Sequence, residues 1–241
     1  MTRVKTAIIL AAGMGERLRD VWAEPKALLR FGDESLIERS SRLLRARGVS
    51  RIVVVTGYRA DAFEPLRGPG VELVANPEFA TTGSMASLDR ALDVVSDDFL
   101  LLEGDIAYEG RALDALIASA SADLVLASGP TGATDEVWVG EETGRVTTLS
   151  KEAPPERRVA EFTGLTRISA ALARRMREAF RRFEVAHGHA RMSYDSDALP
   201  AAAAEHTIRL IVIPDLLWGE VDYASHHARM RERVWPFLGV D

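Results

Sequence analysis

The sequence predicts an α/β protein built on a doubly wound, mixed but mostly parallel sheet. Three observations lead to this fold class. Short apolar runs alternate with amphipathic helical segments up to about residue 127, which is the pattern of βαβ units. The first apolar run leads directly into glycines, as a buried parallel strand of a Rossmann-like sheet does. Beyond residue 127 the alternation stops and strands separated by turns follow, which predicts small antiparallel additions in the C-terminal half.

Strands and helices alternate in order through the first half. The expected strands are Thr6–Leu10, Arg51–Thr56, Val71–Ala75, Asp98–Leu102 and Asp123–Ala127. The expected helices are Ser35–Arg47, Ser84–Val95 and Arg111–Ala118. Leu36, Leu43 and Leu44 share one face of the first helix, and Gly48 follows it as a stop signal. Ser84 is a candidate cap for the second helix.

The second half contains more strands than helices. The expected strands are Glu136–Gly140, Arg145–Ser150, Ala160–Ile168 and Ile208–Ile213, and the expected helix is Ala170–Phe183. The charged stretch 152–158 contains two prolines and is the best candidate for a mobile loop. Because no linker composition separates two units, we expect a single domain over 1–241, made of halves 1–127 and 128–241.

Composition excludes several classes of function. The chain has 241 residues, a net charge of −6 and no cysteine. Disulfides and cysteine-bound zinc are therefore excluded, and the acidic balance argues against a nucleic-acid partner. No segment reaches the ~18 apolar residues of a membrane span, and the first apolar run is too short for a signal peptide. We therefore expect a cytoplasmic protein with no membrane partner.

A glycine loop follows the first strand. Gly13-Met14-Gly15 would let backbone N–H groups approach a phosphate, with the next helix adding its dipole. Arg17 adds a permanent positive charge. A plain strand-to-helix turn would explain the glycines alone equally well. A dinucleotide-binding fingerprint needs a small residue where Leu18 stands, which disfavours a dehydrogenase, and the lysine of a Walker A motif is absent from the loop.

The segment from Ala7 to Tyr58, with LAAGMGERL and the later PKALLRF that contains Lys26, resembles the sugar-phosphate nucleotidyltransferase superfamily. Within it the sequence is most similar to phosphocholine and phosphonate cytidylyltransferases. The resemblance is dense over about the first 60 residues and recurs as separated islands to residue 235. It implies the nucleotidyltransferase (GT-A-like) fold. Residues 18–24 contain one residue fewer than the family pattern, so we expect this loop to have an altered shape.

Two distant carboxylates are candidate metal ligands. Asp105 ends the apolar run LLLEGD, and Asp222 belongs to the late WGEVD segment. Hard carboxylate oxygens suit Mg²⁺, and the resemblance implies that these two residues form the family's metal-binding pair. Asp222 could instead cap the helix that begins after it. The five histidines show no ligand spacing, and His226 and His227 are expected to be exposed on that last helix.

The resemblance implies separate nucleotide and acceptor sites. The nucleotide-binding candidates are Leu10, Ala11, Ala12, Gly13, Met14, Gly15, Glu16, Arg17, Lys26, Asn76, Thr82, Gly83, Ser84, Ser87, Gly104 and Asp105. The acceptor-binding candidates are Lys151, Glu161, Gly164, Tyr194, Asp195, Asp197, Trp218 and Glu220. Simple capping would also explain Ser84, and an exposed position at a strand end would explain Lys151. Arg157, Arg158, Arg167 and Arg191 could meet a second anionic group on the acceptor or be surface residues.

These residues predict a Mg²⁺-dependent transfer from a nucleoside triphosphate to a small phosphate or phosphonate acceptor. The resemblance to phosphocholine and phosphonate cytidylyltransferases implies that the donor is CTP and that CMP is transferred. Arg17, Lys26 and Lys151 are the expected catalytic cations. An acceptor oxygen already ionised at pH 7 needs no general base, so positioning and charge neutralisation would carry catalysis. The alternatives are a hexose-1-phosphate or inositol-phosphate nucleotidyltransferase and a nucleotide-binding module without turnover. The apolar tail at 235–238 could pack internally or support a homodimer.

Overall fold

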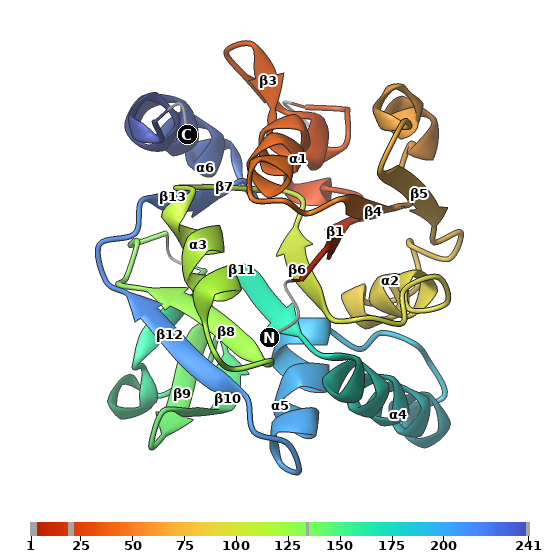
Figure 1. Ribbon diagram of the computed structural model, residues 1–241, viewed down its shortest axis with the longest axis vertical. Coiled ribbons are helices and arrows are strands. Elements are labelled where there is room, and N and C mark those ends of the chain that lie inside the picture. The colour runs from red at the N-terminus through yellow and green to blue at the C-terminus, as the bar shows by residue number, and fades with distance from the viewer. Residues whose placement is uncertain (1–3, 19–21, 134, 240–241) are drawn as a thin grey trace.

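A nine-stranded mixed sheet runs through the computed structural model, which describes residues 4–18, 22–133 and 135–239 (Figure 1). Its strand order is β5-β4-β1-β6-β11-β8-β12-β10-β9. The strands are β1 (Thr6–Ala11), β4 (Arg51–Thr56), β5 (Val71–Ala75), β6 (Phe99–Glu103), β8 (Leu124–Ser128), β9 (Trp138–Glu142), β10 (Arg145–Ser150), β11 (Ala160–Ile168) and β12 (Arg209–Ile213). The predicted α/β class with a mixed sheet is confirmed.

One antiparallel strand divides the sheet into two regions. β1 pairs in parallel with β4 and β6, and β4 pairs in parallel with β5. β11 then runs antiparallel between β6 and β8, and β12 is parallel to β8. All nine residues of β11 are buried, including the charged Glu161 and Arg167, whose side chains form hydrogen bonds within the fold. The antiparallel additions predicted for the second half are β9 and β10 at the far edge.

Helices cover both faces of the sheet (Figure 1). They are α1 (Leu36–Ala46), α2 (Ser84–Ala91), α3 (Arg111–Ala118), α4 (Ala170–His187), α5 (Leu199–Ala203) and α6 (Ala224–Arg229). Side chains alternate along a strand, so Ile8 of β1 joins the core beneath α2, α4 and α5, whereas Ala7 and Ile9 join the core beneath α1 and α3. A capping box formed by Ser35 and Glu38 begins α1.

Short elements fill the space between the helical layers and the strand ends. The two short ladders are β2 (Arg30–Phe31) with β3 (Glu34–Ser35), and β7 (Ile106–Tyr108) with β13 (Trp218–Glu220). The remaining turns are η1 (Glu16–Leu18), η2 (Lys26–Leu28), η3 (Ala60–Leu66), η4 (Pro155–Arg157), η5 (Tyr194–Ala198), η6 (Met230–Val234) and η7 (Trp235–Phe237). A third apolar core joins several of these to the C-terminal helical segment, which lies near α1 (Figure 1).

Several element boundaries differ from the sequence prediction. α2 ends at Ala91 instead of Val95, and the last residues fold back as turns that bond to its final carbonyls. α4 continues past Phe183 to His187, where Gly188 ends it with a φ of +70°. The tail packs internally through Leu238, while Phe237 stays 68% exposed. Among the described helices, none is long and apolar enough to cross a membrane.

Candidate functional site

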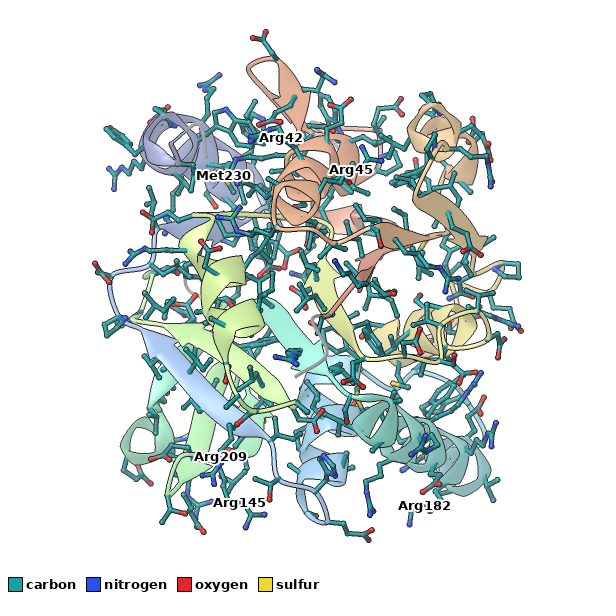
Figure 2. The ribbon with its side chains drawn as sticks, viewed as in Figure 1. Arg42, Arg45, Arg145, Arg182, Arg209 and Met230 are labelled. Atoms are coloured by element: carbon teal, nitrogen blue, oxygen red, sulfur yellow. The ribbon has the colours of Figure 1, made fainter. Side chains whose placement is uncertain are left out.

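A cavity of about 490 Å³ opens at the carboxyl ends of β1 and β6 and extends beneath β13 and α6. Ligands of open α/β sheets bind at such strand ends. The predicted residues that line it are Leu10, Ala11, Ala12, Gly13, Arg17, Lys26, Thr82, Gly83, Ser84, Ser87, Gly104, Asp105, Lys151, Glu161, Gly164, Tyr194, Asp195, Trp218, Glu220 and Asp222. None of the labelled arginines lines it: Arg42 and Arg45 belong to α1, Arg145 to β10, Arg182 to α4 and Arg209 to β12 (Figure 2).

Lys26 lies between the two predicted metal ligands. Its ammonium forms ion pairs with Asp105 and with Asp222, where the Nζ–Oδ1 distance is 2.5 Å. The three side chains are only 15–18% exposed. Burial lowers the pKa of Lys26, but the two carboxylates outweigh it and hold the pKa above its ordinary value. For Asp222, burial raises the pKa, but Lys26, a hydrogen bond from Glu220 and Arg17 together hold it below its ordinary value.

Backbone contacts bring these three residues together although they are far apart in sequence. Asp105 follows β6, and the N–H of Gly104 bonds to the carbonyl of Leu10 at 2.9 Å. A Cβ at Gly104 would lie 2.8 Å from that carbonyl oxygen, so only glycine fits. The N–H of Val221 bonds to the carbonyl of Asp105 at 3.0 Å, which aligns the end of β13 with the end of β6.

The glycine loop contributes part of its length to the cavity. Met14, Gly15 and Glu16 lie off the cavity wall, and Gly15, with a φ of +58°, lies against the stem of Lys26 instead. Arg17 donates a hydrogen bond to Oδ2 of Asp222 at 3.0 Å. Of the loop predicted to have an altered shape, residues 19–21 lie outside the described residues.

A hydroxyl-rich cluster forms the next wall. Asn76 does not line the cavity: its buried amide donates to the hydroxyls of Thr82 and Ser87 at 3.1 and 3.0 Å and holds both in place. Ser84 is not the helix cap, because Gly83 occupies that position. The hydroxyl of Ser84 instead accepts a hydrogen bond from the N–H of Tyr194 at 2.9 Å.

The segment 190–194 runs along the beginning of α2. The N–H of Gly83 bonds to the carbonyl of Ala190 at 2.8 Å, and the N–H of Met85 bonds to the carbonyl of Met192 at 3.0 Å. A Cβ at Gly83 would overlap the backbone of Met192. A glycine is therefore required where the predicted nucleotide side meets the predicted acceptor side.

The opposite wall carries the acceptor candidates. Oε1 of Glu161 accepts a hydrogen bond from the Thr131 hydroxyl at 2.8 Å, and Oε2 accepts from the Thr131 N–H at 2.5 Å. Burial raises the pKa of Glu161 to about 7, although these hydrogen bonds oppose the shift. The indole of Trp218 donates to Ser128. Asp197 lies off the wall, because its carboxylate accepts the N–H of Ser193 at the start of η5.

The cavity also contains charged residues that the sequence did not single out. Glu103 is partly buried beside Asp105, accepts the hydroxyl of Tyr194 at 2.7 Å, and has its pKa raised to about 8, mainly by desolvation. The sequence signal that could have identified Glu103 is its position, because a charged residue there ends an otherwise apolar strand. Arg229 and His226 also line the cavity. His226 was expected to be exposed, but it is buried and its Nε2 lies 3.2 Å from the carbonyl of Ala133.

Two groups of carboxylates fit a divalent cation. Oxygens of Glu103, Asp105 and Glu220 lie within 4.8 Å of one another, and so do those of Asp135, Glu220 and Asp222. Mg²⁺ prefers such hard oxygen donors, so the donor set fits it. The helix-cap alternative for Asp222 is not supported, since α6 begins after Tyr223 without a side-chain cap.

The fold, with a glycine loop at the end of its first strand and converging charges at the end of β6, places the chain among the α/β nucleotidyltransferases. It belongs to the MobA-like NTP transferase domain family, whose model matches residues 7–196. The resemblance drawn from the sequence is therefore confirmed.

Several curated proteins are similar in sequence to this chain. The chain is 30% identical over 90% of its length to the CMP-5'-(3-aminopropyl)phosphonate synthase of Streptomyces rubellomurinus. It is 34% identical over 39% of its length to the choline-phosphate cytidylyltransferase of Streptococcus pneumoniae. It is 32% identical over 98% of its length to a bifunctional IPC transferase and DIPP synthase of Rubrobacter xylanophilus. The matches span 36%, 42% and 53% of these relatives' own lengths.

The fold is shared with a solved structure. The inositol-1-phosphate CTP transferase from T. maritima superposes with a TM-score of 0.76 at 21% identity, covering 97% of this chain and 98% of that one. At this identity the likeness establishes the nucleotidyltransferase fold.

Proposed function

We propose that the chain is a Mg²⁺-dependent cytidylyltransferase that transfers CMP from CTP to a small phosphate or phosphonate acceptor and releases pyrophosphate. The observation that best supports this proposal is the contact of Lys26 with both Asp105 and Asp222 at the end of β6, beside the glycine loop. The names of the relatives support cytidylyl transfer to phosphonate or phosphocholine acceptors.

In the proposed reaction an acceptor oxygen forms a bond to the α-phosphorus of CTP, and the bond from that phosphorus to the bridging oxygen breaks to release pyrophosphate. The N–H groups from residues 10–13 would hold the triphosphate. Lys26 and Arg17 would turn from the aspartates to the phosphates and balance the charge of the leaving group. Lys151, on the far side of the cavity, would hold the acceptor oxygen in line.

Asp105 and Asp222, which both contact Lys26, would hold Mg²⁺, and Glu220 belongs to a carboxylate group with each of them. Bound there, the ion would neutralise phosphate charge. Catalysis would then require that Lys26 give up its place between the two aspartates. The mostly buried position of all three side chains makes this charge exchange the central event of substrate binding.

The test is a pyrophosphate-release screen that crosses the four ribonucleoside triphosphates with several acceptors. The acceptors are phosphocholine, 2-aminoethylphosphonate, 3-aminopropylphosphonate, its carboxylated counterpart, glucose 1-phosphate and inositol 1-phosphate. We expect CTP to be the preferred donor. Asp105→Ala should reduce turnover at least ~10³-fold, because it removes a proposed ligand of the Mg²⁺ that would neutralise charge in the transition state. Asp114 is a surface carboxylate paired with Arg47, so Asp114→Ala should not reduce turnover.

The screen also tests the alternatives. Carboxylates accept hydrogen bonds from hydroxyl groups, so the acidic wall formed by Glu161, Asp195 and Glu220 could also bind a polyol phosphate. Turnover only with inositol 1-phosphate or glucose 1-phosphate would replace the proposed acceptor class. Nucleotide binding without pyrophosphate release from any acceptor would indicate a binding module and contradict the proposal.

A further inference from the structure

Arg229 is a cation of the cavity wall that the proposed reaction does not use. It is the last residue of α6 and lines the cavity together with Glu161 and Gly219. Its side chain is partly buried. Gly219 leaves room for it, because a Cβ at that position would lie 3.0 Å from Nη1 of Arg229. The guanidinium is therefore placed in the wall by the fold and not left on the surface.

The guanidinium has donors without acceptors. Within residues 4–18, 22–133 and 135–239, no hydrogen bond or ion pair joins it to another group. Two other enclosed arginines differ from it: Arg39 donates to two backbone carbonyls, and Arg177 pairs with Asp89 and Asp93. A partly buried guanidinium has five N–H donors and keeps its charge, so one without a protein partner in a ligand cavity is available to bind an anion.

Glu161, a carboxylate on which the charge of Arg229 acts, does not supply that anion. Both carboxylate oxygens of Glu161 already accept hydrogen bonds from Thr131. The arginines that the sequence offered for a second anionic group do not line the cavity. Arg167, for example, donates to the carbonyls of Leu116 and Ser119 in the interior of the fold.

The order of the strands separates Arg229 from the phosphate-binding end. The glycine loop follows β1 and Asp105 follows β6, whereas Glu161 lies on β11, the next strand across the sheet. In the proposed reaction Lys151, which also lines the cavity, offers a charge to the reacting group of the acceptor. Arg229 is therefore free to bind the opposite end of an acceptor.

We propose that Arg229 determines acceptor specificity by binding a carboxylate, so that the preferred acceptor is a small phosphonate or phosphate that also carries a carboxylate group. The inference rests on the proposed cytidylyl transfer. A guanidinium binds a carboxylate through two parallel N–H···O bonds, and the cavity of about 490 Å³, shared with the nucleotide, leaves space for a small acceptor only.

The test uses two acceptors that differ by one group: 3-aminopropylphosphonate and the same molecule with a carboxylate on the amine-bearing carbon. Pyrophosphate release from CTP gives kcat/KM for each. The wild type should prefer the carboxylated acceptor by about 10- to 100-fold, the effect of a hydrogen-bonded charge pair. Arg229→Met should reduce this ratio at least ~10-fold, and Arg229→Lys should restore part of it, because lysine keeps the charge without the paired donors.

Arg231→Met is the matched control, since Arg231 is 68% exposed and pairs only weakly with Glu232; its ratio should equal that of the wild type. Arg229→Gln, checked by circular dichroism, replaces the methionine variant if that fails to fold. An equal loss with both acceptors would place Arg229 on the reacting phosphonate and overturn the proposal. A wild type without preference would overturn it as well.

Calorimetry, which measures how tightly each acceptor binds, tests the role of Arg229 independently of the proposed cytidylyl transfer. Absence of pyrophosphate release with every acceptor would contradict cytidylyl transfer. Tighter binding of the carboxylated acceptor by the wild type, lost in Arg229→Met, would still support the role of Arg229. Equal binding of both acceptors, or binding of neither at millimolar concentration, would contradict it.

Discussion

Replacing Lys26 with methionine should destabilise the protein and open its carboxylate pair to metal. Lys26 contacts both Asp105 and Asp222 from a position that is 15% exposed. Methionine keeps most of the volume of the stem but removes the charge. The two aspartates would then face each other, while Arg17 would still pair with Asp222.

Removal of one partner from a buried ion pair costs about 3–5 kcal/mol, because the other charge stays in the protein without compensation. We expect about 3 kcal/mol here, since Arg17 still pairs with Asp222. In a domain of this size that loss lowers Tm by about 6–12 °C. The pKa of Asp222 lies below its ordinary value in the wild type, so this stabilisation exists above the ordinary carboxyl pKa and is lost as the pH falls.

Thermal and urea unfolding at pH 7 and at about pH 4 measure the effect. The deficit of Lys26→Met should be largest at pH 7 and smaller in acid. Millimolar Mn²⁺ or Mg²⁺ without nucleotide should raise the Tm of the variant more than that of the wild type, because the cation can take the vacated place. Lys5→Met, at an exposed lysine that bonds only to the Gly48 carbonyl, is the control. A variant within 2 °C of the wild type and insensitive to metal would refute the reasoning.

Three further predictions concern other parts of the fold. Gly83→Ala would overlap the backbone of Met192, and we expect a loss of about 1–3 kcal/mol in unfolding free energy by calorimetry; an unchanged Tm would contradict it. Burial raises the pKa of Glu161 to about 7, so the folded state holds its proton more tightly and stability should fall as the pH rises from about 4.5 to 7. Glu161→Gln should flatten this dependence in urea titrations at pH 5 and 8, and an equal slope in both proteins would disprove it. Arg39→Met would leave two backbone carbonyls without a donor and should cost about 2 kcal/mol in urea unfolding; a change below 0.5 kcal/mol would count against it.

Most strands of the sheet could be predicted from the sequence, because a strand that is buried on both faces is a short apolar run. The apolar runs became β1, β4, β5, β6 and β8, and the helix Arg111–Ala118 was predicted with its observed bounds. The ladder of β7 with β13 was not predicted. Each of its strands has three residues, and their pairing joins segments about 100 residues apart. Such pairing is fixed by the tertiary fold and not by local pattern.

Some of the proposed site residues could be selected from the sequence because their residue types suit the proposed chemistry. Glycines, Lys26 and the two aspartates were selected from the sequence, and the structure brings them to one cavity. The contact of Lys26 with both aspartates was not foreseen, because it depends on the distance between three distant segments. Arg229 and Glu103 were missed for a related reason. Their importance comes from burial without a full set of partners, which no spacing in the sequence reveals.

The hydrogen bonds between segment 190–194 and the start of α2 have a consequence for redesign. Tyr194 belongs to the proposed acceptor side, while Ser84, to which its N–H bonds, belongs to the proposed nucleotide side. A substitution that moves Tyr194 would therefore disturb nucleotide selection together with acceptor selection. The wall formed by α6 has no such bond to α2 within the described residues. A library directed at Arg229 and its neighbours could therefore change the acceptor while the donor nucleotide stays the same.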